Sequence, residues 1–203
     1  GDARYDWWAD ANDHAVFDNV KLVHELCPKK GLWVTEVCQE LGSHLGDWAV
    51  AERYAETIIK DFNNWCEAFV DWNLILDHEG GPNHRKNQCS APIIVDVPKD
   101  RVIFQPSFFY IGHFARHIQP GAVRILSSAS RKSLETLAVE NPDGTIVVNV
   151  LNETEQTTNF CLSYKGKIVR WASESHSLVT LVFQGGDPAS KAKPMDTSGA
   201  GPA

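Results

Sequence analysis

The sequence predicts an α/β segment followed by an all-β module, and two patterns of apolar residues support this fold class. Up to about residue 118, short apolar runs typical of buried strands alternate with stretches whose apolar residues recur at helical spacing. From residue 122 onward, apolar residues recur at every second position, which is typical of antiparallel strands with one buried face. The change of period predicts one unit over residues 1–120 and a second over residues 121–184.

The first unit alternates between strand and helix patterns along the chain. In order, we expect a strand end at 5–9, a helix at 16–26, a strand at 31–36, a helix after Asp47 and a strand at 68–74. Pro28 and Gly31 terminate the first helix, and Asp47 supplies an N-cap for the second. A long loop is expected over 77–103, after which Pro106 fits the first turn of another helix.

The second unit reads as a succession of antiparallel strands. The turn sequence Asn141-Pro142-Asp143-Gly144 predicts a hairpin between strands at 134–139 and 145–151. Further strands are expected at 159–164, 167–172 and 177–183. The remaining residues, 185–203, have too little apolar content to fold, so we expect a disordered tail.

Composition excludes several classes of protein. The 203 residues are 43% hydrophobic and carry a net charge of −7 with both signs interspersed, so nothing favours nucleic acid as a partner. No apolar run reaches the length of a membrane-spanning helix. Five cysteines without CxxC spacing fit neither a disulfide framework nor a zinc site, so we expect buried free thiols. The histidines show no ligand spacing, and we expect neither a metal nor a cofactor.

A carboxylate at the end of a predicted strand is the first candidate for function. Glu36 ends the strand at 31–36, and the next strand ends in Asp71-Trp72-Asn73. In α/β barrels, functional side chains collect at the C-terminal ends of the strands, and a tryptophan face suits a sugar ring. A surface glutamate and a core tryptophan are the plainer explanations, and these residues alone leave both open.

Longer motifs add to this pattern, and they occur in one order along residues 5–183. They are Thr35-Glu36-Val37-Cys38, Asp71-Trp72-Asn73-Leu74, Glu79-Gly80-Gly81-Pro82-Asn83, Pro92-Ile93-Ile94-Val95-Asp96 and Pro142-Asp143-Gly144. With them the chain resembles the glucosylceramidases of glycoside hydrolase family 30. The resemblance implies strands six to eight of a (β/α)₈ TIM barrel, followed by most of an antiparallel β-sandwich. We therefore expect the C-terminal part of a longer enzyme.

The resemblance also implies a reaction and a set of site residues. It implies a retaining β-glycosidase that hydrolyses glucosylceramide to glucose and ceramide by double displacement, with Glu36 as nucleophile. The substrate-binding residues would be Trp7, Trp8, Trp72 and Asn87. The family's acid/base glutamate lies in an Asn-Glu-Pro motif on barrel strand four, and that motif is absent from these 203 residues. We therefore expect the chain alone to be inactive.

Two departures from the family pattern keep other functions open. Asp6 stands where lysosomal relatives have histidine, and Trp8 stands where they have tyrosine. These changes leave room for a β-1,6-glucanase or xylanase of the same family. A truncated, non-catalytic glycan-binding protein is a third alternative.

The expected partners and location follow from the lipid substrate. They are glucosylceramide or another β-glucoside, a membrane surface that presents the lipid, and an activator protein. The triplet Asn152-Glu153-Thr154 is an N-glycosylation sequon, so we expect a glycan on Asn152 and a lysosomal or secreted protein.

Overall fold

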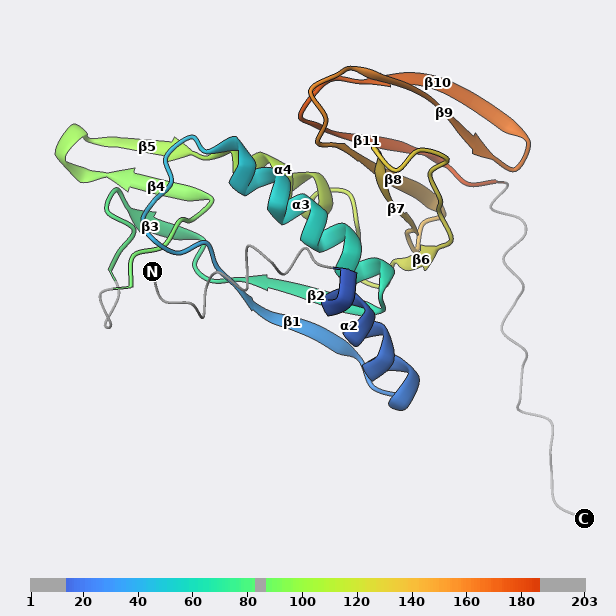
Figure 1. Ribbon diagram of the computed structural model, residues 1–203, viewed down its shortest axis with the longest axis horizontal. Coiled ribbons are helices and arrows are strands. Elements are labelled where there is room, and N and C mark those ends of the chain that lie inside the picture. The colour runs from blue at the N-terminus through green and yellow to red at the C-terminus, as the bar shows by residue number, and fades with distance from the viewer. Residues whose placement is uncertain (1–13, 83–86, 187–203) are drawn as a thin grey trace, which may run out of the picture.

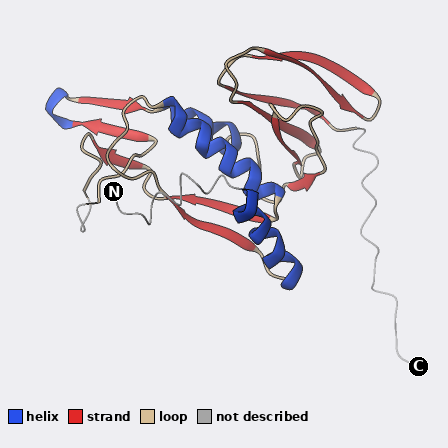
Figure 2. Ribbon diagram, viewed as in Figure 1, coloured by secondary structure: helices blue, strands red, loops and turns tan. Residues whose placement is uncertain are grey.

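The computed structural model describes residues 14–82 and 87–186 (Figure 1). Within these ranges the helices are α2 (His14–Leu26), α3 (Trp48–Asn63) and α4 (Pro106–Ala115), with one 3₁₀ turn, η2 (Val97–Lys99). The strands before residue 120 are β1 (Leu32–Val37), β2 (Cys66–Asp71), β3 (Ile75–Asp77), β4 (Ile93–Asp96) and β5 (Arg101–Phe104). Those after it are β6 (Val123–Ile125), β7 (Glu135–Glu140), β8 (Thr145–Asn152), β9 (Thr158–Tyr164), β10 (Lys167–Ser173) and β11 (Ser177–Gln184). Within the described ranges, every helix precedes β6 (Figure 2).

Strands β1 and β2 form a parallel pair joined by α3, which confirms the expected strand–helix–strand order. Helix α3 begins at Trp48 because the Asp47 carboxylate accepts a hydrogen bond from the Ala49 amide at 3.1 Å. Its buried face carries Ala51, Ala55, Ile58 and Ile59, which recur at helical spacing. The strand expected at 5–9 lies outside the described residues.

The long loop expected over 77–103 is wrong in its second part, because Ile93–Asp96, Val97–Lys99 and Arg101–Phe104 form β4, η2 and β5. The apolar run of β4 pairs with β3 in parallel and with β5 in antiparallel fashion. The turn between β4 and β5 is tight: Asp100 adopts a left-handed φ of 46°, and Arg101 donates a hydrogen bond to the buried Asp96 carboxylate at 3.0 Å. Strand β2 also ends at Asp71, earlier than expected, because Asn73 leaves the extended region with a φ of 68°.

The all-β part contains two sheets. One is four-stranded, with order β11-β8-β7-β6 and antiparallel pairing throughout, and the other is the β9–β10 hairpin. The turn between β7 and β8 forms as expected: the Asn141 amide donates to the Thr145 carbonyl at 2.8 Å, and Gly144 supplies a φ of 83°.

The four-stranded sheet is a middle layer with a different core on each face. On one face, Leu137, Val139, Val147 and Leu151 pack against apolar side chains of α3 and α4. On the other face, alternate residues such as Ile146, Val148 and Val150 face the β9–β10 hairpin. Helix α3 contributes side chains both to this core and to the cluster with β1. The two parts of the chain therefore pack directly against each other.

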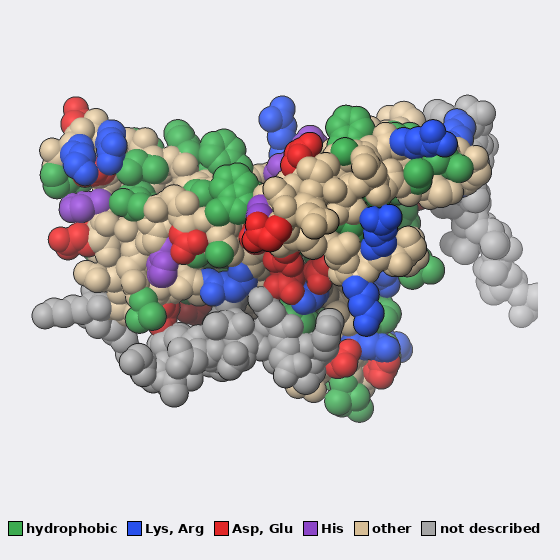
Figure 3. All heavy atoms as spheres, turned by 45° about the horizontal axis from the view of Figure 1, so that its top comes forward, with side chains coloured by type: hydrophobic (Ala, Val, Ile, Leu, Met, Phe, Trp, Pro, Cys, Tyr) green, Lys and Arg blue, Asp and Glu red, His purple; other side chains and the backbone are tan. Residues whose placement is uncertain are grey.

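On the face shown in Figure 3, acidic and basic side chains lie near one another, with apolar side chains between them. In the described part of the chain, no helix is long and apolar enough to cross a membrane.

All five cysteines are free, as expected, but their expected burial is confirmed only in part. Cys89 is buried, Cys38 and Cys66 are half-buried, and Cys27 and Cys161 are exposed. The tail from residue 187 onward lies outside the described residues.

Candidate active site

Glu36 lies one residue before the C-terminal end of β1, and its side chain is exposed. The parallel pairing is irregular here: Val34 pairs with Phe69 and Val37 with Asp71, so two residues of β1 face one of β2. This extra residue lets Val34 and Val37 both point toward the interior while Glu36 points outward. The local fold therefore keeps a solvent-exposed carboxylate at the strand end.

The end of β2 lies beside the end of β1, joined by a hydrogen bond from the Trp72 amide to the Val37 carbonyl at 2.7 Å. Asp71, the last residue of β2, is largely buried. Its Oδ1 accepts a hydrogen bond from the Tyr54 hydroxyl at 2.8 Å and another from the Trp72 amide at 3.0 Å. Its Oδ2 is buried with no hydrogen-bond partner in the described part of the chain.

Burial raises the pKa of Asp71 to about 6, while the hydrogen bonds from Tyr54 and the Trp72 amide act in the opposite direction. Sequence reasoning missed Asp71 as a site residue. The available signal was its place at the head of the Asp71-Trp72-Asn73 motif. The carboxyl fixes the backbone that presents Trp72, so we class it as a positioning residue.

Trp72 is half-buried and packs against the small cluster of Leu76, Cys89, Ala91 and Ile94. Asn87 is also half-buried, and its amide donates a hydrogen bond to the Glu40 carboxylate. Both side chains come from segments next to the β1 end. Their expected contact with substrate remains a prediction, and Trp7 and Trp8 lie outside the described residues.

A group of possible metal ligands lies just beyond β1. The sulfurs of Cys38 and Cys89 and a carboxylate oxygen of Glu40 are all within 4.8 Å of one another. The hydrogen bond with Cys89 and burial raise the pKa of Cys38. Sequence reasoning placed Cys38 near the site but missed Glu40 and Cys89, because no spacing rule connects residues that meet only through the fold.

The expected glycan on Asn152 conflicts with the fold. Asn152 is 0% exposed, and its Nδ2 donates to the backbone carbonyls of Gln156, Ser173 and Glu174 at 2.9, 3.1 and 2.8 Å. Its Oδ1 accepts from the Thr154 amide and hydroxyl. The amide nitrogen that would carry the sugar is thus consumed inside the protein, where a glycan has no room.

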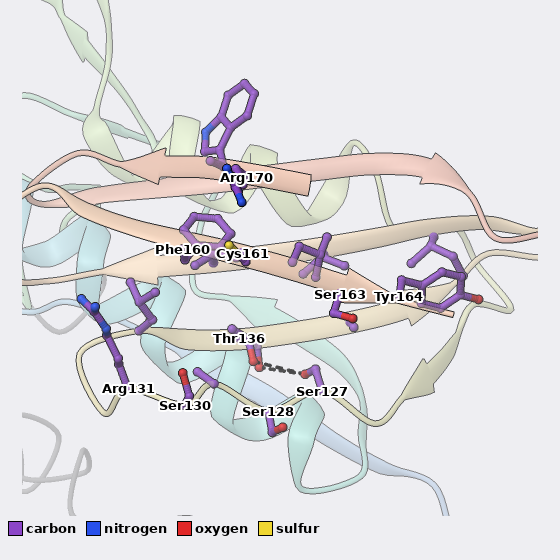
Figure 4. A pocket seen from close by; sticks show the side chains of 18 of the residues that line it. Ser127, Ser128, Ser130, Arg131, Thr136, Phe160, Cys161, Ser163, Tyr164 and Arg170 are labelled. Atoms are coloured by element: carbon purple, nitrogen blue, oxygen red, sulfur yellow. Dashed lines mark hydrogen bonds between the residues drawn. The ribbon is translucent and has the colours of Figure 1, made fainter. Parts of the chain in front are cut away.

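A cavity of about 1200 Å³ lies away from Glu36 (Figure 4). It opens between the four-stranded sheet and the β9–β10 hairpin. Ser127, Ser128 and Arg131 come from the β6–β7 connection, and Phe160 and Arg170 come from the hairpin. None of the expected site residues lines it, so this cavity is separate from the carboxylate site.

Comparison with known proteins shows that two parts of the chain match domains of one enzyme family. Residues 4–118 match the glycosyl hydrolase family 30 TIM-barrel domain, and residues 121–181 match the family's beta sandwich domain. The lysosomal acid glucosylceramidase of Mus musculus is 38% identical over 146 residues, which are 69% of this chain and 28% of that protein.

Two solved structures share the fold. SrfJ from Salmonella typhimurium superposes with a TM-score of 0.79 at 33% identity, covering 83% of this chain and 38% of that one. The endo-beta1,6-glucanase BT3312 superposes with a TM-score of 0.74 at 24% identity, again covering 83% of this chain and 38% of that one. At this identity the similarity shows the fold alone. The chain spans less than two fifths of the length of each of these three proteins. The expected partial barrel followed by a β-sandwich is thereby confirmed.

Proposed function

The chain belongs to glycoside hydrolase family 30, and on that basis we propose that it supplies the nucleophile of a retaining β-glycosidase. In this reaction the Glu36 carboxylate attacks the anomeric carbon and forms a covalent glycosyl-enzyme, which water then hydrolyses. The observation that supports the proposal most is the exposed Glu36 carboxylate at the irregular end of β1, directly beside the end of β2.

The residues around Glu36 have supporting tasks in the proposed site. Trp72 would place a ring face against the sugar and exclude water from the developing positive charge. Asp71 would hold the Trp72 backbone through its 3.0 Å hydrogen bond. The acid/base carboxylate would come from a part of the enzyme that these 203 residues do not contain, so we expect the isolated chain to be inactive.

We propose glucosylceramide as the substrate, with another β-glucoside as the alternative. The likeness to a mammalian glucosylceramidase supports this choice. A second support is the loop after β1, the strand that carries Glu36. In this loop Leu41 is 74% exposed and Leu45 is 50% exposed. Apolar side chains at that place suit a lipid aglycone. A membrane surface and an activator protein that present the lipid would be partners, in a lysosomal or secreted setting.

Mechanism-based labelling tests the proposed nucleophile. The whole polypeptide that carries this chain is treated with a β-glucosidase epoxide probe, digested, and mapped by mass spectrometry. We expect the label on Glu36, and its loss in Glu36→Gln. Glu79→Gln is the matched control, because Glu79 is an exposed carboxylate in the turn after β3. A label that persists in Glu36→Gln, or an unlabelled but folded protein, would refute the proposal.

A further inference from the structure

We propose that Cys38, Glu40 and Cys89 form a binding site for a zinc ion beside the nucleophile strand. The ion would be held by two thiolate sulfurs and one carboxylate oxygen, with water in the fourth position. This site goes beyond the proposed glycosidase function, which needs no metal.

The fold brings these three residues together from two separate segments. Cys38 and Glu40 follow β1 at alternate positions of an extended segment, so their side chains leave on the same side. Cys89 comes from the segment that pairs with it: Glu40 and Cys89 form an antiparallel bridge. Hydrogen bonds from the Ser90 amide to the Gln39 carbonyl, at 2.7 Å, and from the Gly42 amide to the Gln88 carbonyl, at 3.0 Å, hold the two segments in register.

The position of Cys89 is further fixed by Gly80. The Cys89 amide donates to the Gly80 carbonyl at 2.9 Å, and a Cβ on Gly80 would come within 2.5 Å of the Cys89 carbonyl oxygen. The chain therefore passes here only because residue 80 has no side chain. A ligand held this rigidly by its backbone is preorganised for binding, since little conformational entropy remains to be lost.

The electrostatics of the cluster favour a cation. Glu40 is only 7% exposed, and a buried carboxylate is costly unless a charge or several donors compensate it. Its side chain accepts a hydrogen bond from the Asn87 amide. Among residues 14–82 and 87–186, no lysine, arginine or histidine forms a salt bridge with it. A divalent ion would supply the missing positive charge, while Asn87 would orient the carboxylate from behind.

The ligand set and its dimensions favour zinc over other ions. Zinc accepts sulfur and carboxylate oxygen together, whereas calcium and magnesium require oxygen ligands alone. Tetrahedral zinc with bonds of about 2.3 Å to sulfur and about 2.0–2.2 Å to oxygen places its ligand atoms roughly 3.6–3.8 Å apart. The three ligand atoms here are within 4.8 Å of one another, so closing around the ion requires movements of about 1 Å or less. Binding would release the protons of both thiols.

Metal titration of the whole polypeptide that carries this chain tests the site. The reduced, metal-free protein is titrated with Zn²⁺ by calorimetry, and with Co²⁺, whose thiolate charge-transfer absorption reports sulfur ligands. We expect one ion per chain. Cys38→Ser and Cys89→Ser should lower zinc affinity by about 100-fold or more, and Glu40→Gln by at least about tenfold. Glu40→Gln retains an oxygen for Asn87, so it keeps the local hydrogen bond while removing the charge.

The controls use the other thiols of the chain. Cys66→Ser and Cys161→Ser should leave zinc affinity unchanged, because one side chain is on β2 and the other is exposed on β9. Absence of stoichiometric binding, or binding that survives Cys38→Ser and Cys89→Ser, would overturn the proposal. So would a Cys38–Cys89 disulfide in protein isolated under non-reducing conditions. These readouts do not depend on glycoside hydrolysis, so the zinc site and the proposed function stand or fall separately.

Discussion

Tyr54 of α3 donates a 2.8 Å hydrogen bond to Asp71 at the end of β2, and this bond joins the helix to the strand end beside Glu36. Tyr54 is 4% exposed and also packs on Val37, the residue after Glu36. One buried side chain thus contacts the ends of both parallel strands. The position of the proposed site therefore depends on α3 as well as on the strands.

Tyr54→Phe is expected to lower the free energy of unfolding by about 1–2 kcal/mol near pH 7, because the buried Asp71 carboxylate loses a donor. It should also raise the pKa of Asp71 above about 6, since the Tyr54 hydrogen bond lowers it. Urea unfolding measures the first effect and NMR titration of the Asp71 carboxyl the second. Tyr164→Phe is the control, because the Tyr164 hydroxyl forms no hydrogen bond to another described residue. Equal losses in both variants would contradict the expectation.

The raised pKa values of two carboxyls, Asp61 and Asp71, predict greater stability in acid than at neutral pH. Burial raises the pKa of Asp61 to about 7 and that of Asp71 to about 6. Each group binds its proton more tightly in the folded than in the unfolded chain. The stabilisation is complete below the unfolded pKa values, near 4, and is lost as pH rises through about 6 to 7. His176 acts in the same direction because hydrogen bonds to Glu155 and Glu52 raise its pKa. The lowered pKa of the half-buried His113 has the opposite effect on stability.

We therefore expect a larger free energy of unfolding at about pH 5 than at about pH 7.5, and a flatter pH dependence in Asp61→Asn. Urea titrations over this range test both points. Asp143→Asn is the control: hydrogen bonds from Thr145 lower the pKa of Asp143, so its contribution is lost only in stronger acid. Stability that rises steadily toward pH 7.5 would refute the prediction.

The sequence predicted the elements whose signals are local, and it missed those that depend on distant partners. Asp47 and the apolar spacing after it correctly placed α3, and Asn141 to Gly144 correctly placed the β7–β8 hairpin. Strand β5 was missed because only its pairing with β4 makes Arg101–Phe104 extended. For the same reason Asp71 and Cys89 had no visible partners: Tyr54 and Glu40 meet them only after the chain folds.

Asn152 is expected to carry no glycan in the folded protein. Both N–H groups of its amide are engaged with three backbone carbonyls, and the side chain is completely buried. Peptide mapping of protein secreted by a eukaryotic host should find the unmodified Asn152 peptide. Asn152→Ala should lower the free energy of unfolding by about 2–3 kcal/mol, because several buried carbonyls lose their donor. Glu155→Gln, at an exposed neighbouring position, is the control; a glycan at Asn152 of folded protein would contradict the burial.

Trp72 is expected to serve both packing and binding, and two substitutions separate these contributions. Trp72→Ala should cost about 2–3 kcal/mol of stability, because a half-buried ring leaves the cluster around Leu76 and Ile94. Trp72→Phe retains much of the contact, so it should cost about 1 kcal/mol yet lower kcat/KM by tenfold or more. Trp171→Phe, on the exposed hairpin strand β10, should change neither quantity. An unchanged kcat/KM in Trp72→Phe would leave Trp72 a packing residue only.

The exposed leucines after β1 predict a difference between lipid and soluble substrates. Leu41 and Leu45 are 74% and 50% exposed, so replacing both with serine removes no buried contact and should change stability by less than about 0.5 kcal/mol. If they contact the lipid chains, the double variant should raise KM for glucosylceramide in vesicles by about 30-fold, since the two lost apolar contacts cost about 1 kcal/mol each. The KM for a small fluorogenic β-glucoside should stay the same. Leu126→Ser is the control, because Leu126 is 90% exposed at the end of β6, far along the chain from Glu36. An equal change of KM for both substrates would mean that the leucines do not contact the aglycone. It would favour a substrate without a lipid chain.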